Sequence, residues 1–274
     1  MIMVRKVKKT KVKTEKKKEH KTHKGLIISL LIVLIVIIAL MGVSYNIMHN
    51  NSFNQAFGVI VGSGNIVSET REITYFNNVE LKYVGNIYVT QGETNTLTIE
   101  AEDNVLPLIT TKVVNNELII NKEGHALTWI IKKKPINIYI TMKDVNELVI
   151  LGSGDIVSSS LITSNDLKLK ISGSGNINVK TNADNLETGI SGSGKITLNG
   201  VANNYNLNIS GSGNVNALEL ITKNTNIMIS GSGHAKVNAI DELNVKISGS
   251  GNVQYTGDPK VSTSISGSGS VKKI

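Results

Sequence analysis

The chain has 274 residues, 25 glycines, no cysteine and a formal net charge of +8 at pH 7. Without cysteine, neither a disulfide framework nor a thiolate metal site is available. Residues 1–24 hold eleven basic and two acidic side chains, which leaves 18 basic and 19 acidic side chains in the rest of the chain. Because this remainder is nearly neutral, it lacks the basic face that nucleic-acid binding needs, and we expect no nucleic-acid partner.

Two segments at the N-terminus predict a membrane anchor. Residues 1–24 are basic, polar and without apolar periodicity, which is typical of a disordered cytoplasmic tail. Residues 26–43 follow as an aliphatic run that only Ser29 and Gly42 interrupt. A helix of that length spans about 27 Å, close to the ~30 Å hydrocarbon core of a bilayer. We therefore predict a single N-terminal transmembrane helix, a signal anchor within residues 25–44.

The charges beside the apolar run predict its orientation. Lysines precede the run and none follows it closely, so we expect the N-terminus in the cytoplasm and the remainder outside the cell membrane. A cleaved signal peptide is the alternative, although its apolar core is usually shorter, ~7–15 residues, and residues 39–41 make a poor cleavage site. An asparagine-rich linker over residues 45–58 would then lead to an extracytoplasmic domain over residues 59–274.

Residues 59–151 are expected to form the irregular N-terminal part of that domain. Alternating apolar and polar residues, rich in β-branched side chains, predict short strands. The expected strands cover residues 79–83, 86–91, 96–101, 109–114, 117–122, 136–142 and 147–151. Asn115 and Asn116 predict a tight hairpin turn, and Asp103 is expected to cap one helical turn over residues 103–107. We expect this part to cover one end of the repeats that follow.

A Gly-Ser-Gly phrase recurs through the chain, and from Gly152 onward its copies begin 18 to 21 residues apart. A fixed period near twenty residues is typical of a solenoid. Glycine permits backbone angles that are closed to other residues, so each phrase is expected to turn the chain between two strands. The predicted corner glycines are Gly62, Gly64, Gly152, Gly154, Gly173, Gly175, Gly192, Gly194, Gly211, Gly213, Gly231, Gly233, Gly249, Gly251, Gly267 and Gly269.

Strict alternation of apolar and polar residues surrounds each phrase and predicts strands with one buried face. The residue two positions before the first glycine is isoleucine in every copy, and stacked coils would place these side chains in one internal ladder. The predicted core ladder is Ile150, Ile171, Ile190, Ile209, Ile229, Ile247 and Ile265. Together the patterns predict an all-β fold, a right-handed parallel β-helix or solenoid with coils of ~18–21 residues over residues 152–274.

The order of one phrase, an extended segment and serial Ser-Gly-Ser-Gly-Asn-Ile/Val coils resembles the head GIN domain family of bacterial envelope proteins. The residues that carry the resemblance are Asn176-Ile177, Asn214-Val215 and Asn252-Val253 after the glycines, and the strands at residues 88–92 and 135–140. The resemblance covers about residues 59–274. It implies a β-helical, envelope-exposed domain of the kind described as an autotransporter adhesin head, and it brings no catalytic residue to this sequence.

A polar column follows the phrases and has two interpretations. The column is Asn65, Asp155, Asn176, Lys195, Asn214, His234, Asn252 and Ser270. It could bind sugar or calcium, or its amides could bond to one another from coil to coil. We favour the structural interpretation, because Lys195 and His234 would repel a cation and Asp155 alone supplies an anionic ligand. We expect no metal site.

One loop carries a candidate ligand contact. The residues are His125, Trp129, Lys132, Lys133 and Lys134. An apolar loop with the only tryptophan of the chain and three lysines could contact a glycan, an anionic wall polymer or lipid headgroups. A surface hairpin with a buried tryptophan is the alternative.

No catalytic or cofactor pattern stands out in the sequence. Arg71 is the only arginine after the predicted anchor, and Asp241 and Glu242 are neighbours whose side chains would point apart. Glu100, Glu102 and Asp103 cluster without a recurring partner. We therefore expect neither a catalytic site nor a cofactor. A carbohydrate-active β-helix enzyme is the alternative, and it would show carboxylates facing each other across a cleft.

The sequence thus predicts a membrane-anchored cell-surface protein that is adhesin-like, or structural in the envelope, and not an enzyme. Its expected partners are the membrane itself and a cell-wall polymer, a glycan or a surface protein. A membrane-tethered polymerising scaffold is a further alternative, which the charge asymmetry around the apolar run opposes. The ligand and the oligomeric state are not predicted.

Overall fold

The computed structural model describes residues 59–123 and 129–274. The chain divides into two compact units, Met1–Val61 and Gly62–Ile274. The predicted basic tail, anchor and linker lie outside the described residues, and strand β1 (Val59–Val61) is the described part of the first unit. Within the described ranges no helix is long and apolar enough to cross a membrane. The transmembrane helix therefore stays a prediction.

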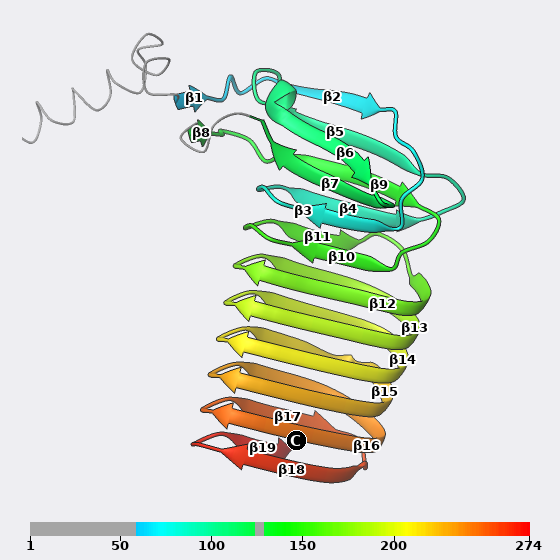
Figure 1. The fold of residues 1–274 in the computed structure, drawn as a ribbon, viewed down its shortest axis with the longest axis vertical. Coiled ribbons are helices and arrows are strands. Elements are labelled where there is room, and N and C mark those ends of the chain that lie inside the picture. Colours follow the sequence, from blue (N-terminus) through cyan, green and yellow to red (C-terminus); the bar gives the residue numbers. More distant parts are fainter. Residues whose placement is uncertain (1–58, 124–128) are drawn as a thin grey trace, which may run out of the picture. The chain divides into compact units, whose positions relative to one another are not determined.

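The unit Gly62–Ile274 is all-β, and most of it is a stack of coils with parallel pairing (Figure 1). The strands of the regular stack are β10 (Glu147–Ile150), β11 (Asp155–Ser158), β12 (Ile162–Gly173), β13 (Asn176–Gly192), β14 (Lys195–Gly211), β15 (Asn214–Gly231), β16 (His234–Gly249), β17 (Asn252–Thr256), β18 (Lys260–Ser266) and β19 (Ser270–Lys273). Each long strand pairs in register with the strand one coil earlier and the strand one coil later. The solenoid prediction is confirmed.

The predicted isoleucine ladder forms the core of the stack. From Ile150 to Ile247 each of its side chains is at most 2% exposed, and the coil register pairs each isoleucine with the next. Ile265 is the exception, with 41% exposure. Its strand β18 pairs with β16 on one side and no described coil covers the other, so its assignment to the buried ladder was wrong.

The two glycines of each phrase turn the chain for different reasons. The first glycine takes positive φ in six copies, from +119° at Gly211 to +148° at Gly173. In the regular coils the second glycine keeps ordinary φ but lies against the previous coil, where a Cβ on Gly213 would come 2.5 Å from Cγ2 of Ile190. Both glycines therefore let neighbouring coils approach closely, and the first glycine also supplies the bend.

An irregular layer precedes the regular coils. Its elements are β2 (Ile66–Arg71), β3 (Asn78–Leu81), β4 (Asn86–Gln91), β5 (Thr96–Glu102), the 3₁₀ helix η1 (Leu106–Leu108), β6 (Ile109–Val114), β7 (Glu117–Lys122), β8 (Trp129–Ile131) and β9 (Asn137–Met142). The predicted strands agree with these to within two residues at each end. Asn115 and Asn116, with φ of 52° and 62°, make the expected hairpin turn between β6 and β7.

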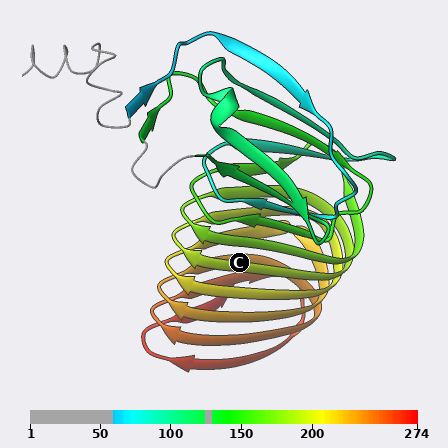
Figure 2. The ribbon, with the colours of Figure 1, turned by 45° about the horizontal axis from the view of Figure 1, so that its top comes forward.

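The layer continues the coils and then closes their end. Strands β3 and β4 pair in parallel with β10 and β11, and β7 and β9 pair in parallel with β3 and β4. Antiparallel pairs follow, with β5 on β9, β2 on β5 and β6 on β7. These strands lie across one end of the stack (Figure 2). An end that must not add further coils thus uses a different pairing pattern.

Two predictions for this layer were wrong. The helical turn is η1 at Leu106–Leu108, which has no side-chain cap, and Asp103 instead accepts hydrogen bonds from Ser63 and Asn65. The phrase at Gly62 and Gly64 is also no coil corner, because it folds over the buried carboxylate of Glu102. A methyl group at Gly62 would overlap that carboxylate, so glycine is required there to leave room for Glu102 and not to turn a coil.

Candidate functional site

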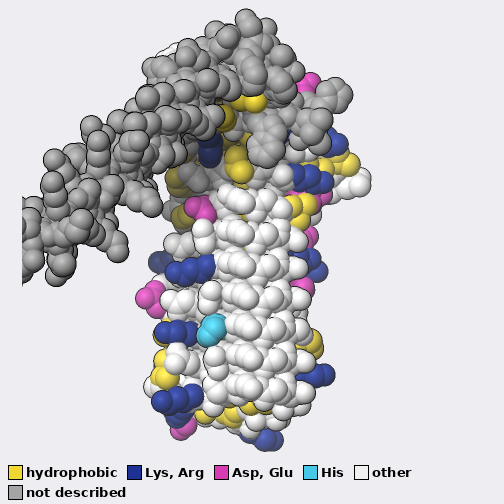
Figure 3. All heavy atoms as spheres, turned by 90° about the vertical axis from the view of Figure 1, so that its left-hand side faces the viewer, with side chains coloured by type: hydrophobic (Ala, Val, Ile, Leu, Met, Phe, Trp, Pro, Cys, Tyr) yellow, Lys and Arg dark blue, Asp and Glu magenta, His cyan; other side chains and the backbone are white. Residues whose placement is uncertain are grey.

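The corners of the coils stack into one edge of the solenoid (Figure 3). An exposed serine column runs along this edge, and its coil register is Ser172, Ser191, Ser210, Ser230, Ser248 and Ser266. The serine between the glycines joins neighbouring coils, since the Ser193 amide donates to the Gly173 carbonyl oxygen at 3.0 Å. The edge is therefore a strip of hydroxyl groups and backbone with few charges.

The polar column after the corners bonds partly to itself. The Asn176 amide donates to Asp155 at 2.7 Å, and the Ser270 hydroxyl donates to Asn252 at 2.7 Å. Asn252 also lies 3.3 Å from the His234 ring nitrogen. These contacts between coils agree with the structural interpretation. Among the described residues no three histidine, aspartate or glutamate side chains gather where a metal ion could bind.

A groove crosses the face of the sheet whose strands lead into the corners. It consists of two hollows of about 510 and 360 Å3 that share Asn208 and Met228, and we call it the sheet-face groove. It runs from Val149 in β10 to Ser264 in β18, across successive coils. Its long direction is therefore the direction of the stack.

A missing side chain deepens this groove. In the outward column the coil register places Gly189 between Lys170 and Asn208. A Cβ at Gly189 would meet nothing nearer than Lys170 Cγ at 3.8 Å, so the position is open. Leu151 and Met228, 42% and 49% exposed, line the same hollow. The groove therefore offers apolar surface beside its hydroxyl and amide groups.

Two of the three charged side chains that line the groove, Lys170 and Glu187, are paired, and the third is Lys246. Lys170 Nζ lies 2.9 Å from Glu147 Oε1, and this hydrogen bond raises the pKa of Lys170. Glu187 lies 3.8 Å from Lys168. Glu187 is also the single carboxylate among the described residues that line the two hollows. Hydrolysis of a glycosidic bond uses two carboxyl groups on either side of the bond, and the described lining of the groove supplies one.

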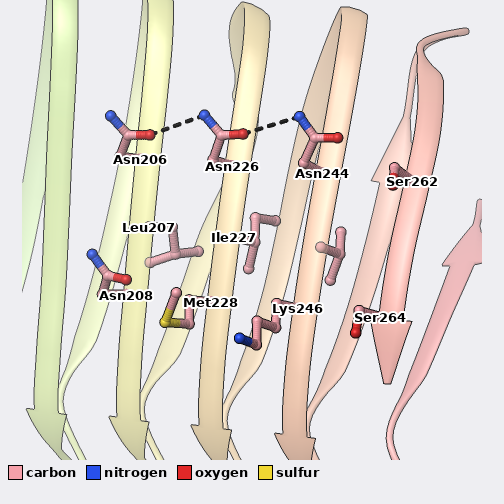
Figure 4. A pocket seen from close by; sticks show the side chains of 11 residues that line it. Asn206, Leu207, Asn208, Asn226, Ile227, Met228, Asn244, Lys246, Ser262 and Ser264 are labelled. Carbon is pink, nitrogen blue, oxygen red and sulfur yellow. Dashed lines mark hydrogen bonds between the residues drawn. The ribbon is translucent and has the colours of Figure 1, made fainter. Parts of the chain in front are cut away.

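An asparagine ladder forms one side of the groove (Figure 4). Asn226 donates to Asn206 and Asn244 donates to Asn226, each at 3.1 Å. A side-chain amide has two donor hydrogens and two acceptor lone pairs, so each ladder member keeps capacity for a ligand. Because the coils repeat at about 4.8 Å, this capacity recurs at a fixed interval along the stack.

The predicted lysine loop is only partly described. His125 and the side chain of Trp129 lie outside the described residues. Lys132, Lys133 and Lys134 are exposed, and the backbone amides of the last two donate to Glu102 Oε2 at 3.0 and 3.4 Å. The structure thus fixes the lysine backbone on a buried carboxylate, while ligand contact by this loop stays a prediction.

The sequence interpretation missed the sheet-face groove. Its walls come from several coils, and the side chains that it exposes, such as Lys170, Asn208 and Met228, are ordinary outward-facing strand residues in their own coils. The available signal was Gly189, a glycine outside any Gly-Ser-Gly phrase in a column that otherwise carries side chains. Only the coil register turns that glycine into a gap.

The stacked coils, their corner columns and the end layer define a β-solenoid domain. Residues 75–259 match the family described as "Putative auto-transporter adhesin, head GIN domain". The chain therefore belongs to the head GIN domain family, as its repeat pattern indicated. No curated protein matches the chain.

Solved structures share the fold over their whole length. A protein from Bacteroides fragilis described as a "putative adhesin" is 27% identical, with a TM-score of 0.75 over 78% of this chain and 100% of its own. A "putative lipid binding protein" from Parabacteroides distasonis is 25% identical, with a TM-score of 0.68 over 79% of this chain and 99% of its own. A "putative adhesin" from Parabacteroides merdae, 22% identical with a TM-score of 0.64, covers 79% of this chain and 99% of its own and shows the fold.

Proposed function

We propose that this protein is an adhesin-like surface protein that binds an extended polymer along the sheet-face groove and does no catalysis. The observation that carries the proposal is the groove itself, which follows the stack over successive coils and is lined by serine and asparagine columns. Its shape suits a chain better than a small molecule. Membership of the head GIN domain family and the adhesin descriptions of its structural relatives support the proposal.

The polymer would be a wall polymer, a glycan or an extended segment of a surface protein. Ladder amides and serine hydroxyls donate and accept hydrogen bonds, so they match hydroxyl and amide groups of any of these chains. The repeat of the ladder lets many weak contacts add up along one ligand. The binding therefore depends on length and is expected to weaken with short fragments.

A lipid ligand is the second candidate. Leu151 and Met228 expose apolar surface in the larger hollow. A relative with the same fold is described as a lipid binding protein. A bound acyl chain would cover these two side chains and would form no hydrogen bonds with the asparagine ladder.

The proposal includes the cellular location. Residues 26–43 would anchor the protein in the cell membrane, with the basic tail in the cytoplasm and the solenoid outside. Protease treatment of intact cells tests this, with detection of residues 59–274 by an antibody. Loss of the solenoid with survival of cytoplasmic proteins is expected, and protection that persists after the wall is permeabilised would contradict it.

The groove itself is tested by filling it. Gly189→Arg places a long side chain at the open position without strain, because the nearest atom to its Cβ belongs to a flexible lysine. The matched control is Asn216→Arg in β15, an exposed residue that does not line the groove. The full-length protein in detergent micelles is mixed with isolated cell walls and with intact cells. We expect that Gly189→Arg alone weakens binding to cell walls and cells, and equal binding by both variants would contradict the groove proposal.

A further inference from the structure

A second cavity lies at the other end of the strands that form the sheet-face groove. Its volume is about 470 Å3, and we call it the Tyr75 pocket. Three successive coils contribute to its wall, through Tyr75 and Asn77 before β3, Asp144 and Asn146 before β10, and Asp166 in β12. In contrast to the groove, this pocket is lined mainly by polar atoms and has an aromatic ring at its rim.

The aromatic ring is exposed and held in place. Tyr75 is 45% exposed, and its hydroxyl donates to Asp144 Oδ2 at 2.9 Å. This hydrogen bond raises the pKa of Tyr75, so the phenol is neutral in the ordinary pH range. A fixed ring that is accessible to solvent offers an apolar face, while the groups around it offer hydrogen bonds. That pairing suits a ligand with an apolar face and a polar edge.

The pocket wall is rich in acceptors. Asn77 Oδ1 is buried and has no hydrogen-bond partner among the described residues, which is costly for a buried carbonyl oxygen. Asp144 accepts from Tyr75 through one oxygen, and a carboxylate has room for further donors. Asp166 accepts from Asn185 at 2.9 Å in the same way. A ligand that carries several hydroxyl groups would supply donors to these two carboxylates.

The charge of the pocket selects against acids. Asp144 and Asp166 form no salt bridge with any described residue. A phosphate or uronate in the pocket would therefore face two carboxylates without a compensating cation, and like charges at close range repel. An uncharged polyol meets no such penalty.

An amide ladder leads away from the pocket along the stack. Asn185 donates to Asp166, Asn204 donates to Asn185 at 3.0 Å, and Asn224 donates to Asn204 at 3.1 Å. Asn204 stands two residues before Asn206 of the sheet-face groove, so both point outward from the same strand. The ladder therefore connects the Tyr75 pocket with the groove across one face of the sheet.

We infer that the Tyr75 pocket is a subsite for an uncharged saccharide ring. Tyr75 packs against the apolar face of the ring, Asp144 accepts from its hydroxyls, and the ladder from Asp166 to Asn224 receives the next residues of the polymer. This inference rests on the proposed function and names its ligand class. The end of the polysaccharide that binds in the Tyr75 pocket then fixes the register of the rest of the chain on the stack.

The test is binding of the full-length protein, in detergent micelles, to a printed array of neutral, amino-sugar and uronate oligosaccharides. The variants are Tyr75→Ala and Asn77→Ala. The matched control is Tyr139→Ala, because Tyr139 is 40% exposed and also donates to a carboxylate, Glu100, at 2.9 Å, but does not line the pocket. Thermal unfolding of each variant checks that the stack is intact.

The wild-type protein is expected to bind neutral oligosaccharides, and Tyr75→Ala is expected to weaken that binding about tenfold or more. Asn77→Ala is expected to weaken it less, and Tyr139→Ala to leave it within about twofold. Binding to no glycan, binding to charged glycans alone, or equal losses in Tyr75→Ala and Tyr139→Ala would each overturn the inference.

The outcomes separate this inference from the proposed function. If Gly189→Arg abolishes binding to cell walls while Tyr75→Ala leaves glycan binding unchanged, the groove is correct and the saccharide subsite is wrong. If neither variant alters any binding, both proposals fail. If Tyr75→Ala alone reduces glycan binding, the ligand class is correct and the groove is not its path.

Discussion

The regular coils from β12 to β17 and the layer from β2 to β9 both pair their strands around a buried core, but they do so with different chemistry. Each regular coil repeats its neighbours, so one register of buried isoleucine and one glycine corner serve the whole stack. The layer uses antiparallel pairs, a hairpin and a buried carboxylate. A repeat can extend without limit, and its end must be built from residues that do not repeat.

The buried carboxylate shows what the end layer requires. Glu102 is 1% exposed and accepts from the backbone amides of Gly64 and Lys133 at 2.7 and 3.0 Å. In the regular coils the corner amides donate to backbone carbonyl oxygens instead, as in the bond from the Ser212 amide to the Gly192 carbonyl oxygen at 2.9 Å. Loops that have no coil to stack on thus use a side chain in place of a backbone partner.

The largest expected effect comes from breaking the regular ladder. Ile209→Asp places a charge without a partner in a site that is 2% exposed, and we expect a loss of roughly 4 kcal/mol in the free energy of unfolding. Ile265→Asp at the last coil, 41% exposed, should cost about 1 kcal/mol or less. Chemical denaturation measures both. Similar costs for the two variants would mean that the ladder does not share one buried column.

Two glycines, Gly192 at a corner and Gly189 in the groove, have different structural roles that substitution by alanine distinguishes. Gly192 has φ of +129°, and a Cβ there would come 2.5 Å from the Gly173 carbonyl oxygen. Gly192→Ala is therefore expected to destabilise the protein by about 2–3 kcal/mol. Gly189→Ala, at an open position without positive φ, should be neutral or stabilising by about 0.4–1 kcal/mol. Thermal unfolding of the two variants compares them directly, and a stable Gly192→Ala protein would contradict the corner geometry.

The end layer is tested at its buried carboxylate. Glu102→Gln keeps the shape but removes the charge that three backbone amides share, and an expected cost of about 1–3 kcal/mol follows from weaker hydrogen bonds. The loss should be local. Hydrogen exchange should accelerate at Gly64, Lys133 and Lys134 and stay unchanged at Ser212. Acceleration through the regular coils as well would show that the layer and the coils unfold as one unit.

The smallest expected effect is a dependence on pH in the same layer. Hydrogen bonds from Ser63 and Asn65 hold the pKa of Asp103 below its ordinary value. Since the pKa is lower in the folded protein, the contribution is present above the unfolded pKa of about 3.9 and is lost as pH falls through the folded pKa. Protection of the Ser63 amide, corrected for intrinsic exchange, should be constant from neutral pH down to about 5 and fall below about 4. Asp103→Asn should remove this dependence, and an unchanged profile in that variant would assign it to another group.

Within the regular coils the sequence was informative because each residue type is tied to one local task. Apolar residues at every second position and glycine at a fixed interval specify strand, corner and buried face coil by coil. Where the tasks involve other parts of the chain, the interpretation failed. Asp103 has the sequence features of a helix cap, yet its carboxylate binds Ser63 and Asn65, about forty residues away in the chain. Ile265 shares the pattern of its ladder and differs only in having no described coil stacked beyond it.

The sequence by itself determined the solenoid, the period of its coils and the identity of its buried ladder, because apolar alternation and glycine spacing act over a few residues. Only the tertiary structure decided the sheet-face groove and the Tyr75 pocket. Gly189 becomes a gap, and Tyr75, Asp144 and Asp166 become one wall, only after the coil register brings residues of different coils together. Local patterns fix how each coil forms, whereas a binding surface depends on which side chains the stacked coils place next to one another.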